Sequence, residues 1–298
     1  MKTHEFTGRA LCETNLHLGE GPTYDRATDT AFWFNIVDSE LHELELSTGR
    51  KQVHRLPAMC SVLARIDDRR QAVVSENGIY IRDRATGAMD LAVEIEADRP
   101  NMRSNDGRVH QSGALWFGTM TKTGEGRKGA GAIYHVAGRK VTKLFSGISI
   151  PNGICFAPDG ATAYFVDTIE NVIKSVAVDP KTGLPAGEPR VFSDERQSGG
   201  SADGAVCDAD GNVWSAHWDG ASVHQIDPSG RKIAIYRLPT PQTSCPAFIG
   251  QNAERLLVTS AAEGMDAARL AAEPKAGYTF ELGVKVNGRF EPDFKWID

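Results

Sequence analysis

Short apolar segments recur along the chain, and a polar or glycine-containing turn separates each from the next. The first group consists of residues 31–34, the alternating segment 40–46 and the segment 52–56. Alternation of apolar and polar residues with a period of two is typical of a half-buried β-strand. The Ser-Thr-Gly sequence at 47–49 provides a hairpin turn. This pattern predicts a small antiparallel sheet.

The same arrangement occurs six times. The steps between equivalent residues are 41, 42, 48, 50 and 43 positions, and these residues are Trp33, Val74, Trp116, Tyr164, Trp214 and Leu257. Four strands in about 40 to 50 residues is the length of a β-propeller blade. We therefore predict an all-β fold, a six-bladed β-propeller, as a single domain over residues 1–298. We expect residues 6–12 to complete the sixth blade and close the ring, and residues 264–272 to form a short helical turn.

Composition narrows the classes of function. Hydrophobic residues make up 41% of the chain and charged residues 24%, which is ordinary for a globular protein with a sizeable core. The net charge of −6 argues against a nucleic-acid partner, because phosphate binding needs a basic face. The five cysteines are widely spaced and include no C-x-x-C pair, which indicates free, buried thiols. No signal peptide or membrane-length apolar run is present, so we expect a cytoplasmic protein without a membrane partner.

Common catalytic motifs are absent from the sequence. It has no G-x-S-x-G elbow, no P-loop and no H-E-x-x-H. The glycine-rich stretch 124–131 lies between two predicted strands, so we interpret it as a flexible loop and not as a phosphate-binding turn. We expect His17 and His217 to be hydrogen-bonded loop histidines.

Polar residues recur at one position of the repeat, which we place in the loop before the innermost strand of a blade. These residues are Glu20, Arg103, Asn105, Asp106, Asn152 and Asp203. Such segments line one mouth of the central channel, where carboxylate and amide oxygens would make a site for a hard divalent cation. Each Xxx-Gly pair taken alone is also an ordinary turn signal. Their shared position in the repeat favours the site.

These segments resemble the gluconolactonase/regucalcin (senescence marker protein) family of six-bladed propellers. The similarity rests on Leu-Gly-Glu-Gly-Pro at 18–22, Arg-Ser-Asn-Asp-Gly at 103–107, Phe-Gly-Thr-Met at 117–120 and Ile-Pro-Asn-Gly-Ile at 150–154. The resemblance implies that Glu20, Asn152 and Asp203 are metal ligands and that Arg103 and Asn105 hold substrate hydroxyls. The implied cofactor is one divalent metal ion, Ca²⁺ or Zn²⁺, with Mn²⁺ or Mg²⁺ as further candidates. Some members carry an acidic lid residue where this chain has Thr-Lys-Thr at 121–123.

The resemblance implies metal-dependent hydrolysis of a sugar lactone to its aldonic acid, with the lactone as a small-molecule partner. Asp203 is our candidate for the general base that activates water. Three alternatives stay open. They are a related propeller esterase or phosphotriesterase, a non-enzymatic calcium-binding protein, and a protein-interaction scaffold. The repeats lack the Gly-His and Trp-Asp signatures of the scaffold class.

Overall fold

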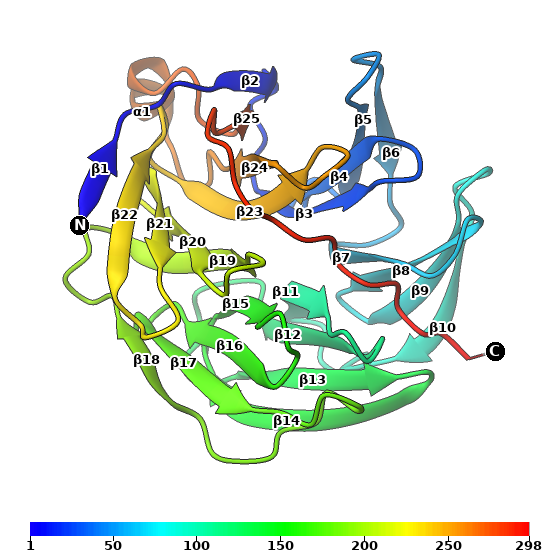
Figure 1. Ribbon diagram of the computed structural model, residues 1–298. Helices are drawn as coiled ribbons and strands as arrows, with labels where there is room; N and C mark the ends of the chain where they lie inside the picture. The colour runs from blue at the N-terminus through cyan, green and yellow to red at the C-terminus, as the bar shows by residue number, and fades with distance from the viewer. Residues whose placement is uncertain (298) are drawn as a thin grey trace.

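Each predicted repeat folds into one antiparallel sheet, and six such sheets surround a central axis in the computed structural model (Figure 1). The predicted all-β fold with six blades is therefore confirmed. The structure describes residues 1–297, so Asp298, the last residue of the predicted domain, lies outside the described residues.

Within each blade the strands follow one another from the axis outward. Blades one to three are β3 (Gly19–Asp25), β4 (Thr30–Asn35), β5 (Glu40–Glu45), β6 (Lys51–Arg55); β7 (Cys60–Arg65), β8 (Arg70–Ser75), β9 (Gly78–Asp83), β10 (Met89–Glu94); and β11 (Met102–Val109), β12 (Leu115–Thr121), β13 (Gly131–Ala137), β14 (Lys140–Ile148). Blades four to six are β15 (Pro151–Phe156), β16 (Thr162–Asp167), β17 (Val172–Ala177), β18 (Arg190–Asp194); β19 (Ser201–Cys207), β20 (Val213–Trp218), β21 (Ser222–Ile226), β22 (Lys232–Arg237); and β23 (Thr243–Ile249), β24 (Arg255–Ser260), β25 (Thr279–Glu281), β2 (Arg9–Cys12).

The apolar and aromatic segments of the repeat form the second strand of each blade. All six residues of β4 are buried, whereas β6 at the outer edge of the same blade has four exposed residues. The second strand is covered on both faces by neighbouring blades, so both of its faces need apolar residues. Trp33 and Trp116, for example, are fully buried. The core is thus a set of apolar layers between blades.

The ring closes through the N-terminal segment, as predicted. Strand β2 pairs antiparallel with β25, and Ala10 lies opposite Phe280. Arg9 adds an ion pair of 3.0 Å with Glu281. Strand β1 (Lys2–His4) adds a parallel edge to β22 in the fifth blade. Residues from the two ends of the chain therefore complete one sheet.

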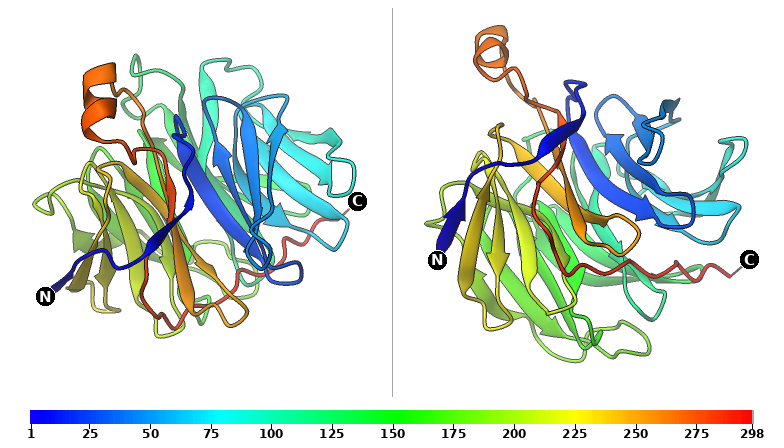
Figure 2. Two further views of the ribbon diagram at one scale, coloured as in Figure 1. Left: turned by 90° about the horizontal axis from the view of Figure 1, so that it is seen from above. Right: turned by 45° about the horizontal axis from the view of Figure 1, so that its top comes forward.

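The one helix among the described residues is α1 (Ala267–Ala272), which falls within the predicted segment 264–272. Asp266 caps it by accepting from the backbone N–H of Arg269. Figure 2 shows α1 on the side of the ring opposite the C-terminal tail, residues 282–297. No helix in the described part of the chain is long and apolar enough to cross a membrane.

We predict that removal of residues 2–12 lowers the free energy of unfolding by about 3 kcal/mol or more. The deletion exposes the edge of β25 and removes its ladder hydrogen bonds together with the buried Cys12 side chain. Urea unfolding followed by tryptophan fluorescence measures the loss. Removal of residues 2–4 alone is the matched control, because β1 is fully exposed. Equal stability of the two truncated proteins would contradict closure by β2.

Candidate active site

Every innermost strand changes its pairing register near its start. The shifts fall between Glu20 and Thr23, Cys60 and Val62, Ser104 and Gly107, Asn152 and Cys155, Ala202 and Ala205, and Thr243 and Pro246. A β-bulge redirects side chains and interrupts the regular ladder, and bulges are frequent beside active sites. The six bulges therefore lie at one level of the channel, and the predicted site residues lie at that same level.

The predicted site residues lie on strands and not in loops, which corrects the expectation from sequence. Glu20 is in β3, Arg103 and Asn105 are in β11, Asn152 is in β15 and Asp203 is in β19. The Xxx-Gly pairs suggested turns because these strands lack a clean alternation of apolar and polar residues.

The glycines in these pairs allow close packing of strands around the axis. Gly21 has a φ of 56°, and a Cβ atom at this position would lie 2.0 Å from the carbonyl oxygen of Ser61 in β7. A larger residue would force β3 and β7 apart. Glycine is thus required here by the approach of a neighbouring blade.

Hydrogen bonds bring three of the predicted residues together. The Nδ2 of Asn105 donates to Oδ1 of Asn152 at 2.7 Å and to the carbonyl oxygen of Pro151 at 3.1 Å. The Nη1 of Arg103 donates to Oδ1 of Asn105 at 2.7 Å. The Nδ2 of Asn152 donates to Oγ1 of Thr168, which fixes the orientation of its amide. The side chains from the third and fourth blades therefore form one network.

The two predicted carboxylate ligands are buried, and each lies near another negative charge. Burial and then the negative charge of Asp106 raise the pKa of Glu20 to about 8. Burial and then the negative charge of Glu20 raise the pKa of Asp203 well above its ordinary value. Among residues 1–297, neither carboxylate makes an ion pair with a lysine or arginine. Two buried carboxylates and an amide oxygen without a cation are a donor set that fits a divalent metal ion.

Sequence reasoning did not assign a role to Asp106, although it noted the residue. Its carboxylate accepts from the backbone N–H of Gly107 at 2.8 Å and of Ile154 at 2.7 Å, so it fastens β11 to β15.

The second and sixth blades contribute serines at the same level. Ser61 donates to Oγ of Ser104, and Ser244 donates to the carbonyl oxygen of Gly19. Alignment of the six bulges would have found these positions.

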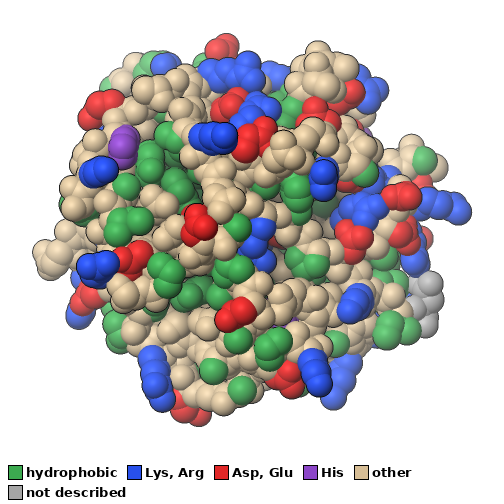
Figure 3. Space-filling model, in the orientation of Figure 1, with side chains coloured by type: hydrophobic (Ala, Val, Ile, Leu, Met, Phe, Trp, Pro, Cys, Tyr) green, Lys and Arg blue, Asp and Glu red, His purple; other side chains and the backbone are tan. Residues whose placement is uncertain are grey.

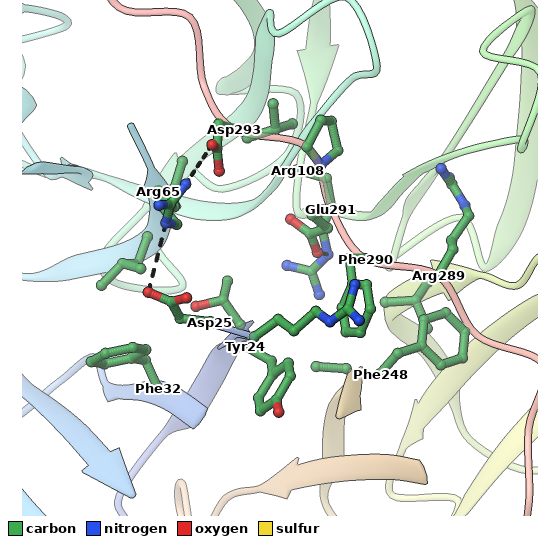
Figure 4. Close-up of a pocket in the computed structure, with 18 of the residues that line it drawn as sticks. Tyr24, Asp25, Phe32, Arg65, Arg108, Phe248, Arg289, Phe290, Glu291 and Asp293 are labelled. Atoms are coloured by element: carbon green, nitrogen blue, oxygen red, sulfur yellow. Dashed lines mark hydrogen bonds and ion pairs between the residues drawn. The ribbon is translucent and has the colours of Figure 1, made fainter. Parts of the chain in front are cut away.

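A cavity of about 580 Å³ lies at the other end of the channel, where the innermost strands end. The C-terminal tail crosses this face and contributes Phe290 and Glu291 to the cavity wall (Figures 1 and 4). Arg65 lies between Asp25 and Asp293 and pairs with both (Figure 4). Acidic and basic side chains are intermixed over this face (Figure 3).

Arg108 lies between the cavity and the predicted site. It lines the cavity, is 3% exposed and pairs with Glu291 of the tail at 2.9 Å. On its other side the guanidinium is 3.9 Å from Asp106 and 3.1 Å from Sγ of Cys245. This buried charge separates the polar site at one mouth from the cavity at the other.

A second cluster of titratable groups lies between the fourth and fifth blades. Oε2 of Glu195 is 3.3 Å from Nδ1 of His224 and 3.6 Å from Nε2 of His217. The two imidazole rings stack with centroids 3.5 Å apart. These three residues could hold a metal ion, since one ligand atom from each lies within 4.8 Å of the others. The ammonium of Lys232, however, lies 2.7 Å from the same Glu195 oxygen and supplies a positive charge.

His217 differs from its expected place in a loop. It belongs to β20 and is completely buried, and neither ring nitrogen has a hydrogen-bond partner among the described residues 1–297. His17 does lie in a loop, 4.0 Å from Asp38. Burial, and next the neighbouring His224, lower the pKa of His217 well below its ordinary value of 6.5. The folded protein therefore holds His217 neutral.

We predict that His217 makes folding stability depend on pH below 6.5. The unfolded chain gains a proton there that the folded chain does not, so stability present above pH 6.5 is lost as the pH falls. The contribution is up to about 1.4 kcal/mol per pH unit. Urea unfolding at pH 7.5, 6.5 and 5.5 should give a smaller slope for His217→Phe than for the wild type. His4→Phe, on the exposed strand β1, is the control. Identical slopes for the wild type and His217→Phe would show that this residue is not the cause.

The fold is a closed six-bladed propeller, and carboxylate and amide groups are buried at one mouth of its channel. The protein therefore belongs to the class of propellers that carry a polar site on the axis. The chain belongs to the SMP-30/Gluconolactonase/LRE-like region family, whose sequence pattern matches residues 18–262. This confirms the resemblance stated above.

Similar proteins cover almost the whole chain. A protein of Rhizobium meliloti (strain 1021), named provisionally as a sugar lactone lactonase, is 56% identical over 97% of this chain and 98% of its own length. The 6-deoxy-6-sulfogluconolactonase of Pseudomonas putida is 30% identical over 93% of this chain and 94% of its own. A solved structure of a calcium-binding protein, regucalcin, from Agrobacterium tumefaciens is 54% identical, covers 99% of both chains and has a TM-score of 0.97.

These names agree with the expected lactone hydrolysis. The Agrobacterium tumefaciens structure is named a calcium-binding protein, and in this chain Glu195, His217 and His224 are a group that could hold a metal ion.

Proposed function

We propose that this chain hydrolyses the lactone of a sugar acid, and that Glu20, Asn152 and Asp203 hold the divalent metal ion that the reaction needs. The observation that carries the proposal is a pair of buried carboxylates at the channel mouth that form no ion pair with a lysine or arginine within residues 1–297. Lactonase names among relatives that match the chain from end to end support the substrate class.

The donor set favours a hard cation. Glu20 offers its Oε1, because its Oε2 accepts from the N–H of Gly21 at 2.8 Å. Asn152 offers an amide oxygen, and Asp203 offers a carboxylate with no side-chain partner among residues 1–297. Oxygen ligands alone suit Ca²⁺, Mg²⁺ or Mn²⁺, whereas Zn²⁺ is found more often with nitrogen and sulfur. We therefore place Ca²⁺ ahead of Zn²⁺.

The residues of the site have distinct tasks in the reaction. Glu20, Asn152 and Asp203 would hold the divalent ion, which would supply polarisation of the lactone carbonyl and stabilisation of negative charge on its oxygen. Asp203 accepts the proton of the attacking water and returns it to the ring oxygen as the C–O bond breaks. Arg103 and Asn105 hold hydroxyl groups of the sugar, which fixes the carbonyl carbon in reach of the water. The products are one carboxylate, one new hydroxyl group and a released proton.

Calcium binding without catalysis is the second candidate, because the 54% identical structure is named a calcium-binding protein. The two candidates differ in one measurable respect. A calcium-binding protein would bind the metal and release no acid from any lactone.

We predict that EDTA abolishes proton release from aldonolactones and that one of Ca²⁺, Zn²⁺, Mn²⁺ or Mg²⁺ restores it. Asp203→Asn should lower kcat/KM by about 1000-fold or more, since it removes both a ligand and the base. A pH-indicator assay with glucono- and pentonolactones measures turnover, and calorimetric titration measures metal binding.

Asp90→Asn is the matched control for this prediction, because Asp90 is exposed on the outer strand β10. It should keep wild-type activity. Metal binding by the wild type without acid release from any lactone would favour the calcium-binding candidate. Wild-type turnover by a folded Asp203→Asn protein would exclude Asp203 as the base.

A further inference from the structure

The loop of residues 122–130 joins β12 to β13 beside the site. It leaves the sheet next to Arg103, which pairs with Met120 in the β11–β12 ladder. Lys122 donates its N–H to the carbonyl oxygen of Asn101 at 2.7 Å. Near the other end of the loop, Gly129 donates its N–H to Oγ of Ser149 at 3.1 Å, shortly before β15 and Asn152 begin. The base of the loop is therefore fastened between two strands that carry site residues.

Arg127 in this loop has a positive charge without a partner. Its side chain is half-buried, its Nε is shielded from solvent without a hydrogen bond, and it forms no ion pair within residues 1–297. Arg99, which holds the same loop from outside, pairs with Glu96 at 2.8 Å and donates to the carbonyl oxygen of Ala130. A partly desolvated guanidinium that lacks an acceptor is unusual and suggests that a ligand supplies one.

Arg127 lies close enough to Arg103 to act on it electrostatically. Arg103 is 7% exposed, and within residues 1–297 its guanidinium donates only to neutral oxygens, those of Ser104 and Asn105. Burial lowers the pKa of Arg103, and the positive charge of Arg127 lowers it further, against the opposite influence of Glu263 and Glu20. The two guanidinium groups thus lie within electrostatic range of each other.

Carboxylates also lie near these two arginines. Glu263, Glu20 and Asp203 act electrostatically on Arg103, but none of them forms an ion pair with Arg127 within residues 1–297. Arg108 is already paired with Glu291 at 2.9 Å and lies 3.9 Å from Asp106. An anionic group on the substrate would therefore give Arg127 its missing acceptor.

We propose that Arg127 binds a second acidic group of the substrate, so that the preferred lactone carries a carboxylate, sulfonate or phosphate away from its carbonyl carbon. This inference rests on the proposed lactonase function. A guanidinium recognises all three groups through paired, charge-assisted hydrogen bonds. Neutral sugar lactones remain substrates with a higher KM, because the metal ligands and Arg103 are unchanged.

The test compares lactones of one size that differ in charge. Glucono-δ-lactone is the neutral arm, and glucarolactone, 6-deoxy-6-sulfogluconolactone and 6-phosphogluconolactone are the carboxylate, sulfonate and phosphate arms. Arg127→Gln should lower kcat/KM for the best anionic lactone by about 10- to 100-fold, chiefly through KM, and leave the neutral lactone within about twofold. Lys128→Gln is the matched control, because Lys128 is exposed on the same loop.

A binding measurement keeps the inference testable without turnover. Calorimetric titration of the metal-loaded protein with glucarate and with gluconate compares two anions of one size and different charge. Tighter binding of glucarate by the wild type, lost in Arg127→Gln, supports the role of Arg127. The same result with 6-phosphogluconate would identify phosphate as the preferred group.

Two outcomes would overturn the inference, and they separate it from the proposed function. Hydrolysis of neutral lactones without any preference for anionic ones, in both the wild type and Arg127→Gln, removes the role of Arg127 and keeps the lactonase. No hydrolysis of any lactone removes the proposed function. In that case equal binding of glucarate and gluconate by the wild type and by Arg127→Gln removes the present inference as well.

Discussion

Close approach of the innermost strands around the axis determines much of what this propeller can do. A Cβ atom at Gly21 would collide with a carbonyl oxygen of the next blade, and one at Gly204 would lie 2.3 Å from Sγ of Cys245. Strands packed so tightly leave no room for a column of large apolar side chains at their bulged ends. Polar groups occupy this level instead, and each needs a partner there.

Some of these buried polar groups have a partner of opposite charge or a hydrogen-bond donor, and others do not. Asp106 is satisfied by two backbone N–H groups, and Arg108 by Glu291 of the C-terminal tail. Glu20 and Asp203 form no ion pair with a lysine or arginine within residues 1–297, and burial followed by neighbouring negative charge raises the pKa of each, that of Asp106 for Glu20 and that of Glu20 for Asp203. Two buried carboxylates without an ion pair, beside buried charges that are paired, favour the proposed cation site.

The blades could be predicted from the sequence because the second strand of each is apolar on both faces, as in β4 with Trp33. The common position of the candidate site residues in the repeat could be read from the sequence. Their place on strands could not, because bulged strands with Xxx-Gly pairs resemble turns. The cluster of Glu195, His217 and His224 joins two blades, so no single repeat contains its pattern. The cavity depends on the irregular C-terminal tail, where periodicity gives no signal.

The proposed metal ligands lie on strands, whereas the proposed specificity residue Arg127 lies on a loop. Glu20, Asn152 and Asp203 lie on strands fixed by neighbours on both sides, so a substitution elsewhere moves them little. Arg127 lies on a glycine-rich loop whose two ends are tied down while its middle can vary. Relatives named for an arabinolactone and for a sulfogluconolactone match more than 90% of this chain. Loops that vary over a constant metal site are the simplest physical means by which one propeller can serve different lactones.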